Sequence, residues 1–416
     1  MVRMRSCIPI PRDIASPKFY TLLVCLWLFT FAFIVLLAKA WSHSENDQQN
    51  AEQRPSSKEI GRDPKTHHFG TEITEQNVTT MNETPSELKY FHFSTEDPQD
   101  GIKWSPKMRS LQAEREPLGV HIRVFPWEQS VFFAHHDPKV DLYVSGALSR
   151  GSMFEESSVI AVASHLDLIL SALQVPVNDL APHQLGFIDI GANLGVYSAG
   201  LGARFLHRFP SLDIFAFEPS DENLALLTSS LRQNGLSNVY LYPYGLTESG
   251  NLGDTVSFVV DTENKGHNHV EGNHSWSEHD GETVQIETVP LDVFTEILKD
   301  QHPEMYRSWS NAVWLKMDTE GLEPYIIRGG GKSLFSNSEM DPCFIKLEII
   351  QHKEEIYTLL TNAGYEMVHF DWNSIAQQHR YSREEVTNHR DWDATFAKKD
   401  AEECVRRKLK NLELLH

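Results

Sequence analysis

The sequence predicts an α/β protein in which helices cover both faces of a mostly parallel sheet. Short apolar segments alternate with segments of helical spacing over the C-terminal half of the chain. Three of the apolar segments end at an acidic residue, namely Asp189, Glu218 and Asp318. Parallel strands need helical crossovers, and the ligands of such sheets bind at the carboxyl ends of the strands. We therefore expect these three acids at one edge of one sheet.

The first strand leads through a glycine turn into a helix. Residues 187–198 read FIDIGANLGVYS, with Asn193 between Gly191 and Gly195. Glycines let a ligand lie against bare backbone, where a Cβ atom would collide with it. The G-x-x-x-G spacing differs from the G-x-G-x-x-G of dinucleotide-binding oxidoreductases, and this favours S-adenosylmethionine over a pyrophosphate ligand. The alternative is an ordinary tight turn that binds nothing.

The second and third strands follow at Asp213–Phe217 and Val239–Leu241. Between them, residues 220–234 read as a helix with a serine N-cap, two acids in its first turn and Gly235 after its end. Glu218 is well placed to accept hydrogen bonds from the two hydroxyls of a ribose.

The later strands complete the sheet. Val313–Met317 precedes Asp318 and Glu320, and residues 344–350 carry Glu348. A last strand is expected near residues 394–398, and a charged tail with a short helix after Asp400. Ahead of the first strand, residues 119–125 and 130–134 read as short strands and residues 153–174 as a helix, a lead-in that covers the front of the sheet.

Five segments, in order, resemble the landmarks of the FkbM-type methyltransferases: DIGANLG at 189–195, FEPSDENLALLTSSLRQNGLSNV at 217–239, VPLD at 289–292, LKMDTEGLEPYIIRGG at 315–330 and LEI at 347–349. The resemblance covers residues 185–398, with a weaker lead-in from about 118. It implies the class I methyltransferase (Rossmann-like) fold with a mostly parallel seven-stranded sheet. It also implies S-adenosylmethionine as the small-molecule methyl donor, and usually a hydroxyl oxygen as acceptor. The polar stretch 254–287 departs from the pattern, so the acceptor side can differ.

The cofactor residues expected from this reading are Asp189, Gly191, Asn193, Gly195 and Glu218. Asp189 would organise the turn and the methionine end of the ligand, the glycines would admit the ligand to the backbone, and Asn193 could hydrogen-bond it. Glu218 would bind the ribose.

The fourth strand end is the usual place where the methyl group is transferred. Asp318 and Glu320 are therefore candidates for general base or acceptor positioning, with Glu323 and Glu348 behind them. Facing carboxylates can raise one another's proton affinity, which suits a base near neutral pH. The alternative is that Asp318 and Glu320 cap the helix at 321–329.

No metal site is predicted. Metal ions are not required for methyl transfer in principle, and loop histidines without tight ligand spacing are usually solvated. Four histidines lie in the polar stretch, and their role stays open; they are His267, His269, His274 and His279.

In the class I fold the last strand runs antiparallel beside the fifth. Cys343 opens the fifth strand and Cys404 follows the last one, so both should reach the same sheet edge. An oxidising compartment would allow them to form a disulfide, and the alternative is two separate thiols.

The N-terminal part predicts a membrane anchor. Phe19–Ala38 carries no charge and would span about 30 Å as a helix, which is the thickness of a bilayer's hydrocarbon core. Basic residues precede it and acidic residues follow, which places residues 1–18 in the cytosol. A cleaved signal peptide is the alternative. Residues 39–115 are polar and read as a disordered luminal stem.

This topology predicts a single-pass type II membrane glycoprotein whose catalytic domain is luminal, in the Golgi, or extracellular. Glycosylation acceptors are expected at Asn77, Asn82 and Asn273. The expected organisation is completed by a lead-in at 116–180, a methyltransferase domain at 181–400 and the tail at 401–416. The formal charge of −21 argues against nucleic acid as a partner, because phosphate would be repelled.

The predicted function is transfer of a methyl group from S-adenosylmethionine to a hydroxyl oxygen, most plausibly of a glycan or glycoconjugate. The glycan rests on the compartment and on no residue. One alternative is a metal-dependent glycosyltransferase, for which Asp391 and Asp393 spell a D-x-D pattern. The other is a binding module that keeps the fold without the chemistry.

Overall fold

The computed structural model describes residues 87–92, 118–172, 182–261, 265, 268–270, 281–337, 339–349, 352–369, 379–388 and 393–413. They all lie in one compact unit, Met81–His416. The predicted anchor and the three glycosylation acceptors lie outside the described residues, as does nearly all of the predicted stem. Within the described ranges no helix is both long enough and apolar enough to cross a membrane.

The main sheet contains nine strands within the described residues. They are β1 (Phe91–His92), β4 (Leu185–Ile190), β5 (Leu212–Phe217), β6 (Val239–Tyr242), β11 (Ala312–Met317), β12 (Phe344–Glu348), β13 (Tyr365–His369), β14 (His379–Arg380) and β15 (Asp393–Lys398). Their order is β1-β6-β5-β4-β11-β12-β15-β13-β14.

Seven of these strands form the predicted sheet, and two short strands extend it. From β6 to β12 all neighbours pair in parallel, whereas β15 runs antiparallel to both β12 and β13. The prediction of seven strands was wrong at the two edges, where β1 and β14 pair antiparallel with β6 and β13. Strands of two residues carry too little periodicity to be found in a sequence.

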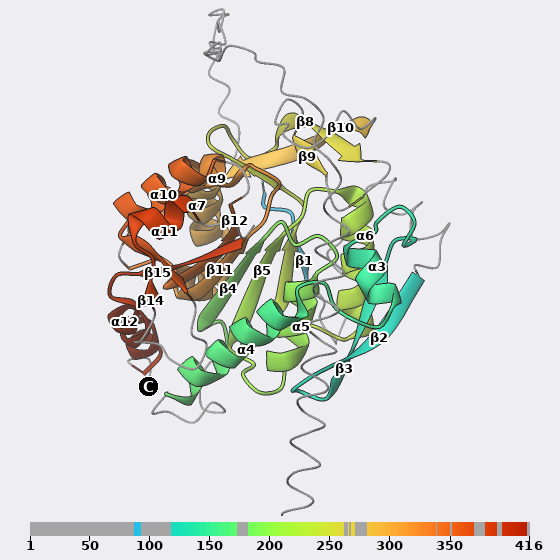
Figure 1. Ribbon diagram of the computed structural model, residues 1–416, viewed down its shortest axis with the longest axis horizontal. Coiled ribbons are helices and arrows are strands. Elements are labelled where there is room, and N and C mark those ends of the chain that lie inside the picture. Colours follow the sequence, from blue (N-terminus) through green and yellow to red (C-terminus); the bar gives the residue numbers. More distant parts are fainter. Residues whose placement is uncertain are drawn as a thin grey trace, which may run out of the picture. The chain divides into compact units, whose positions relative to one another are not determined.

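Helices cover both faces of this sheet, as predicted (Figure 1). One face carries α4 (Glu156–Ser171), α5 (Val196–Phe205), α6 (Asp221–Gln233) and α12 (Ala401–Glu413). The other carries α7 (Leu291–Gln301), α8 (Pro303–Ser310), α9 (Glu323–Gly329) and α10 (Lys353–Asn362). Two shorter helices are α3 (Val144–Ser149) and α11 (Arg383–Asn388).

The strands alternate between the two cores with a period of two. Phe187 and Ile214 pack into the core on the α5 side, whereas Ile188 and Phe215 pack into the core on the α7 side. All four side chains are fully buried. Because both faces are covered, these strands read as continuous apolar runs, and that is the signal by which they were predicted.

The polar stretch at 254–287 and the residues beside it contain strands that were not predicted from the sequence. β7 (Gly245–Thr247), β8 (Asp254–Asp261), β9 (His269–Val270) and β10 (Gly281–Pro290) form a second sheet in the order β7-β10-β8-β9. β8 and β10 pair over eight residues each, and Figure 1 shows both beside the main sheet. The lead-in strands are β2 (Leu118–Val124) and β3 (Gln129–His135), which pair as a hairpin.

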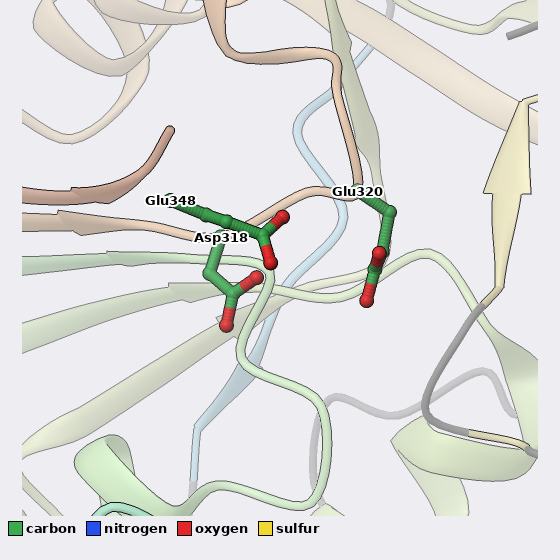
Figure 2. Close-up of side chains that lie close together, drawn as sticks. All are labelled: Asp318, Glu320 and Glu348. Atoms are coloured by element: carbon green, nitrogen blue, oxygen red, sulfur yellow. The ribbon is translucent and has the colours of Figure 1, made fainter. Parts of the chain in front are cut away.

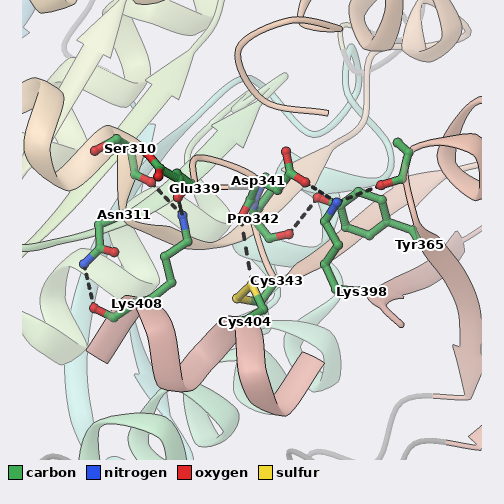
Figure 3. Close-up of a disulfide and its surroundings, with 11 residues drawn as sticks. Ser310, Asn311, Glu339, Asp341, Pro342, Cys343, Tyr365, Lys398, Cys404 and Lys408 are labelled. Atoms are coloured by element: carbon green, nitrogen blue, oxygen red, sulfur yellow. Dashed lines mark hydrogen bonds and ion pairs between the residues drawn. A yellow bond between two sulfur atoms is a disulfide. The ribbon is translucent and has the colours of Figure 1, made fainter. Parts of the chain in front are cut away.

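The C-terminal segment, expected as a charged tail with a short helix, is the packed helix α12, Ala401–Glu413. Its inner side buries Cys404, Val405 and Leu409, while Arg406 faces outward in ion pairs with two glutamates of the same helix. Lys408 is fully buried, and its Nζ donates hydrogen bonds to the carbonyl oxygens of Ser310 at 2.6 Å and Glu339 at 2.9 Å (Figure 3).

A disulfide joins Cys343 and Cys404, whose Cα atoms lie 5.7 Å apart (Figure 3). Cys343 precedes β12, and Cys404 lies in the first turn of α12. The bond therefore ties the last helix to the start of the strand that ends at Glu348.

We predict that this disulfide contributes about 2–4 kcal/mol to the free energy of unfolding, because it closes a loop between residues 61 apart in the chain. Replacing both cysteines by alanine should lower the stability by that amount in urea denaturation. Reductant should produce the same loss in the wild type and none in the double variant. A double variant as stable as the oxidised wild type would contradict the prediction.

Candidate functional site

The candidate site lies where the strand order reverses. The chain places β5 and β6 on one side of β4, and then crosses to β11 and β12 on the other. In open α/β sheets the ligand crevice lies at such a switch point, outside the carboxyl ends of the strands. Asp189, Glu218 and Asp318 all lie at this edge, because β4 pairs in parallel with both β5 and β11.

The turn after β4 is held by hydrogen bonds from β5. The amides of Gly191 and Ala192 both donate to the carbonyl oxygen of Phe217, at 3.0 and 2.9 Å. Gly191, Asn193 and Gly195 all have positive φ, at 74°, 50° and 82°. This conformation favours glycine, which explains two of the three residues.

The two glycines are also required by the protein's own packing. A Cβ atom on Gly191 would lie 1.9 Å from the carbonyl oxygen of Asp318, and one on Gly195 would lie 2.2 Å from Leu227 Cδ1. The sequence analysis attributed these glycines to the approach of a ligand. The structure gives them a different reason, which is contact with the neighbouring strand end and with α6.

Glu218 joins the glycine turn to the start of α6. One carboxylate oxygen accepts a hydrogen bond from the Asn193 amide at 2.8 Å, and the other accepts one from the Ser220 amide at 2.9 Å. Burial raises the pKa of Glu218 to about 6, against the opposing effect of these amides. Asn223 Nδ2 also donates to the second of these oxygens at 3.4 Å, so the oxygen bonded to the Asn193 amide keeps a lone pair for a ligand hydroxyl.

Asp189 is fully buried beneath the turn. Its Oδ2 accepts a hydrogen bond of 2.5 Å from Ser198 Oγ on α5, and its Oδ1 lies 3.5 Å from Lys316 Nζ. That Oδ1 has no hydrogen-bond partner among the described residues.

Three carboxylates lie close together beside the glycine turn (Figure 2). Asp318 follows β11, Glu348 ends β12, and Glu320 projects from the loop between β11 and α9. One oxygen of each lies within 4.8 Å of the others, and all three residues are half-buried. The structure thus brings together the three residues that were predicted as catalytic.

This carboxylate cluster retains protons. Burial and the negative charges of Asp318 and Glu323 raise the pKa of Glu320 to about 8. Burial and the surrounding acids raise the pKa of Glu348 to about 10. Both glutamic acids are therefore largely neutral at pH 7, and they can donate hydrogen bonds. Such oxygens could also hold a divalent cation, but the two acids would first have to lose their protons.

Helix capping does not explain these acids. Within the described part of the chain, α9 begins at Glu323 without a side-chain cap. Instead, Glu323 Oε1 accepts hydrogen bonds from the amide and the hydroxyl of Thr319, at 2.8 and 2.9 Å. Glu323 thus orders the loop between β11 and α9, and it leaves Asp318 and Glu320 to face the edge of the sheet.

Two buried lysines beneath the cluster were missed by the sequence analysis. Lys316 and Lys346 are paired across β11 and β12, two residues before Asp318 and Glu348 respectively. Both ammonium groups lie near the face of the Tyr197 ring, at 5.7 and 5.8 Å from its centroid. The sequence could have indicated them, because each lysine lies within an apolar strand. A lysine buried there needs a partner of opposite charge.

Lys346 connects the lead-in to the main sheet. Its Nζ lies 2.5 Å from Asp393 Oδ2 and 3.1 Å from Glu155 Oε2, and Glu155 also accepts a hydrogen bond of 2.7 Å from the Tyr197 hydroxyl. Asp393 was weighed as half of a D-x-D pattern, and here it pairs with a lysine. Asp391 lies outside the described residues. Of the four histidines in the polar stretch 254–287, three also lie outside them, and the fourth, His269, lies in β9.

Comparison with known proteins identifies the domain. The model of the methyltransferase FkbM domain matches residues 189–367. No curated protein matches the chain.

Several solved structures are weakly similar. Precorrin-6y C5,15-methyltransferase from Geobacter metallireducens GS-15 is 13% identical, covers 56% of this chain and 87% of its own, and has a TM-score of 0.25. A SAM-dependent methyltransferase from Aquifex aeolicus is 10% identical, with coverage of 58% and 96% and a TM-score of 0.25. M. jannaschii TYW2, in complex with AdoMet, is 9% identical, with coverage of 56% and 76% and a TM-score of 0.23.

The family assignment rests on the matched domain, and the strand order described above agrees with it. The matched residues run from Asp189 to β13, and so include the glycine turn and the carboxylate cluster. Residues 189–367 therefore form a methyltransferase FkbM domain, for which S-adenosylmethionine is the methyl donor.

Proposed function

We propose that this protein transfers the methyl group of S-adenosylmethionine to a hydroxyl oxygen, with the acceptor bound at Asp318, Glu320 and Glu348. The observation that carries the proposal is the meeting of these three carboxylates beside the turn that follows β4. Donor and acceptor must lie in line for the displacement, and two adjacent strand ends provide that proximity.

The residues at the donor side fit the cofactor. Glu218 has acceptor capacity left for a ribose hydroxyl, and Asp189 lies under the turn, where its Oδ1 has an ion pair with Lys316 and no hydrogen bond among the described residues. Asn193 is half-buried at the top of that turn, within reach of a ligand. When bound, S-adenosylmethionine supplies an electrophilic methyl group on a sulfonium.

On the acceptor side, Asp318 is the proposed general base. Glu320 and Glu348 hold protons at neutral pH, so they cannot take another, whereas they can donate hydrogen bonds to a hydroxyl oxygen. The ammonium group of Lys316 lies 3.8 Å from Asp318 Oδ2. A cluster of acceptors and donors of this kind also suits a polyhydroxyl acceptor such as a glycan.

A luminal location supports the glycan acceptor. The uncharged segment Phe19–Ala38, with basic residues before it, is typical of a signal-anchor, and a disulfide joins Cys343 to Cys404. We propose a type II membrane protein of the Golgi whose methyltransferase domain meets glycans in the lumen.

The first prediction concerns the donor. Full-length protein should bind S-adenosylhomocysteine, and Glu218→Gln should weaken this binding about tenfold or more, because a charged acceptor is lost. Isothermal titration calorimetry measures both. Asp341→Asn removes a buried carboxylate near the start of β12, at the opposite edge of the sheet, and should leave the affinity unchanged.

The same measurement has a pH dependence. Since the pKa of Glu218 is about 6, its protonation below pH 6 should weaken the binding in the wild type and not in Glu218→Gln. An affinity that Glu218→Gln does not change would remove Glu218 from the donor site.

The second prediction concerns the base. Asp318→Asn keeps the size of the side chain but cannot accept the hydroxyl proton, so turnover should fall by about 10²–10⁴-fold. The affinity for S-adenosylhomocysteine should change little. Transfer of labelled methyl groups to a panel of glycoproteins measures turnover, with the exposed Asp300→Asn as control. Near-normal turnover of Asp318→Asn would end its assignment as the base.

The third prediction concerns the compartment. The protein should resist carbonate extraction and lose apparent mass on treatment with a peptide N-glycosidase, and mass spectrometry should find methylated glycans only in cells that contain it. An unglycosylated protein with a cytosolic C-terminus would overturn the luminal location. It would leave the methyl transfer itself untouched.

A further inference from the structure

Lys316 is a buried cation that contacts both halves of the site. Its side chain is 7% exposed, and its Nζ donates a hydrogen bond of 2.6 Å to the carbonyl oxygen of Gly191. The same nitrogen lies 3.5 Å from Asp189 Oδ1 and 3.8 Å from Asp318 Oδ2. One ammonium group thus contacts Asp189 near the end of β4, the glycine turn and the proposed base.

The turn depends on its neighbours for its conformation. From β5, the Phe217 carbonyl accepts hydrogen bonds from the amides of Gly191 and Ala192. From β11, Lys316 donates a hydrogen bond to the carbonyl oxygen of Gly191. The peptide unit between Gly191 and Ala192 is therefore held from both sides, by β5 through its amide and by Lys316 through its carbonyl. The positive φ of Asn193, two residues further along the turn, is costly for a residue with a Cβ atom and needs such support.

We propose that Lys316 is a positioning residue for the methyl donor: its ammonium group anchors the Gly191 carbonyl and holds the donor-binding turn against the strand end that carries Asp318. The proposal rests on the assignment of this turn to the donor. Lys316 acts through the turn and through Asp318, and it needs no contact with either substrate.

Lys346 offers a matched comparison within the same chain. It is a lysine at the same register on the neighbouring strand, it is 10% exposed, and it lies equally close to the Tyr197 ring. Its partners are Glu155 and Asp393, and both lie outside the turn. Loss of either lysine removes a buried cation, but only Lys316 contacts the donor turn.

The test compares Lys316→Met with Lys346→Met in the full-length protein. Both variants should melt at a lower temperature than the wild type, because each leaves buried carboxylates without their partner. In calorimetry with S-adenosylhomocysteine, Lys316→Met should bind about 10- to 100-fold more weakly, as for the loss of a charged hydrogen bond. Lys346→Met should keep its affinity within about twofold.

The outcomes distinguish a failure of the donor site from a failure of the role of Lys316. A wild type that fails to bind S-adenosylhomocysteine would refute the donor site itself. A folded Lys316→Met with wild-type affinity, or equal weakening in both variants, would overturn the role of Lys316 alone.

A second variant covers the case in which Lys316→Met does not fold. Lys316→Met combined with Asp318→Asn removes one negative charge together with the lysine and so restores the local charge balance. This double variant should bind S-adenosylhomocysteine at least about tenfold more weakly than Asp318→Asn alone, because the Gly191 carbonyl still lacks its donor. Equal affinity in the two proteins would refute the proposal.

Discussion

The contact between the Gly191 turn and the end of β11 is the constraint on which the site depends. Only a residue without a Cβ atom fits at Gly191, because the carbonyl oxygen of Asp318 occupies that space. The backbone amide of Asp318 in turn donates to the Ile190 carbonyl at 3.1 Å. Two strands far apart in sequence therefore present their ends at a fixed spacing, one with the donor turn and the other with the proposed base.

The charges at this edge are arranged in two rows. Asp189, Lys316 and Lys346 form an inner row on three neighbouring strands, and Asp318 and Glu348 lie one step nearer the edge of the sheet. The lysines balance part of the negative charge, and protons on Glu320 and Glu348 reduce the rest. Burial of Lys316 opposes its charged form. The nearby carboxylates of Asp189 and Asp318 outweigh this effect and raise the pKa of Lys316. Several carboxylates can therefore lie close together at this site without a large excess of buried negative charge.

Much of this arrangement could be predicted from the sequence. The strands of the main sheet were found because both faces are buried, and the helix at Asp221–Gln233 was found because its start and end carry ordinary signals, a serine and Gly235. The proximity of the acids at the strand ends was predicted because the carboxyl ends of parallel strands lie at the same edge of a sheet.

Features that depend on distant contacts could not be predicted. β1 and β14 are two residues long, and β8 and β10, which pair with each other in the polar stretch, are separated by residues 262–280. The reason for Gly191 is a backbone atom more than a hundred residues away. Glu155 reaches Lys346 from the lead-in, which no local pattern indicates.

The central claim is that the methyl donor binds at the carboxyl ends of β4 and β5, beside Asp318. Photo-crosslinking of isotope-labelled S-adenosylmethionine to the full-length protein, followed by peptide mapping, tests it most directly. The label should appear in peptides that contain residues 189–198 or 217–223, and excess S-adenosylhomocysteine should compete it away. Competed labelling confined to peptides elsewhere in the chain, with none at these strand ends, would contradict the account.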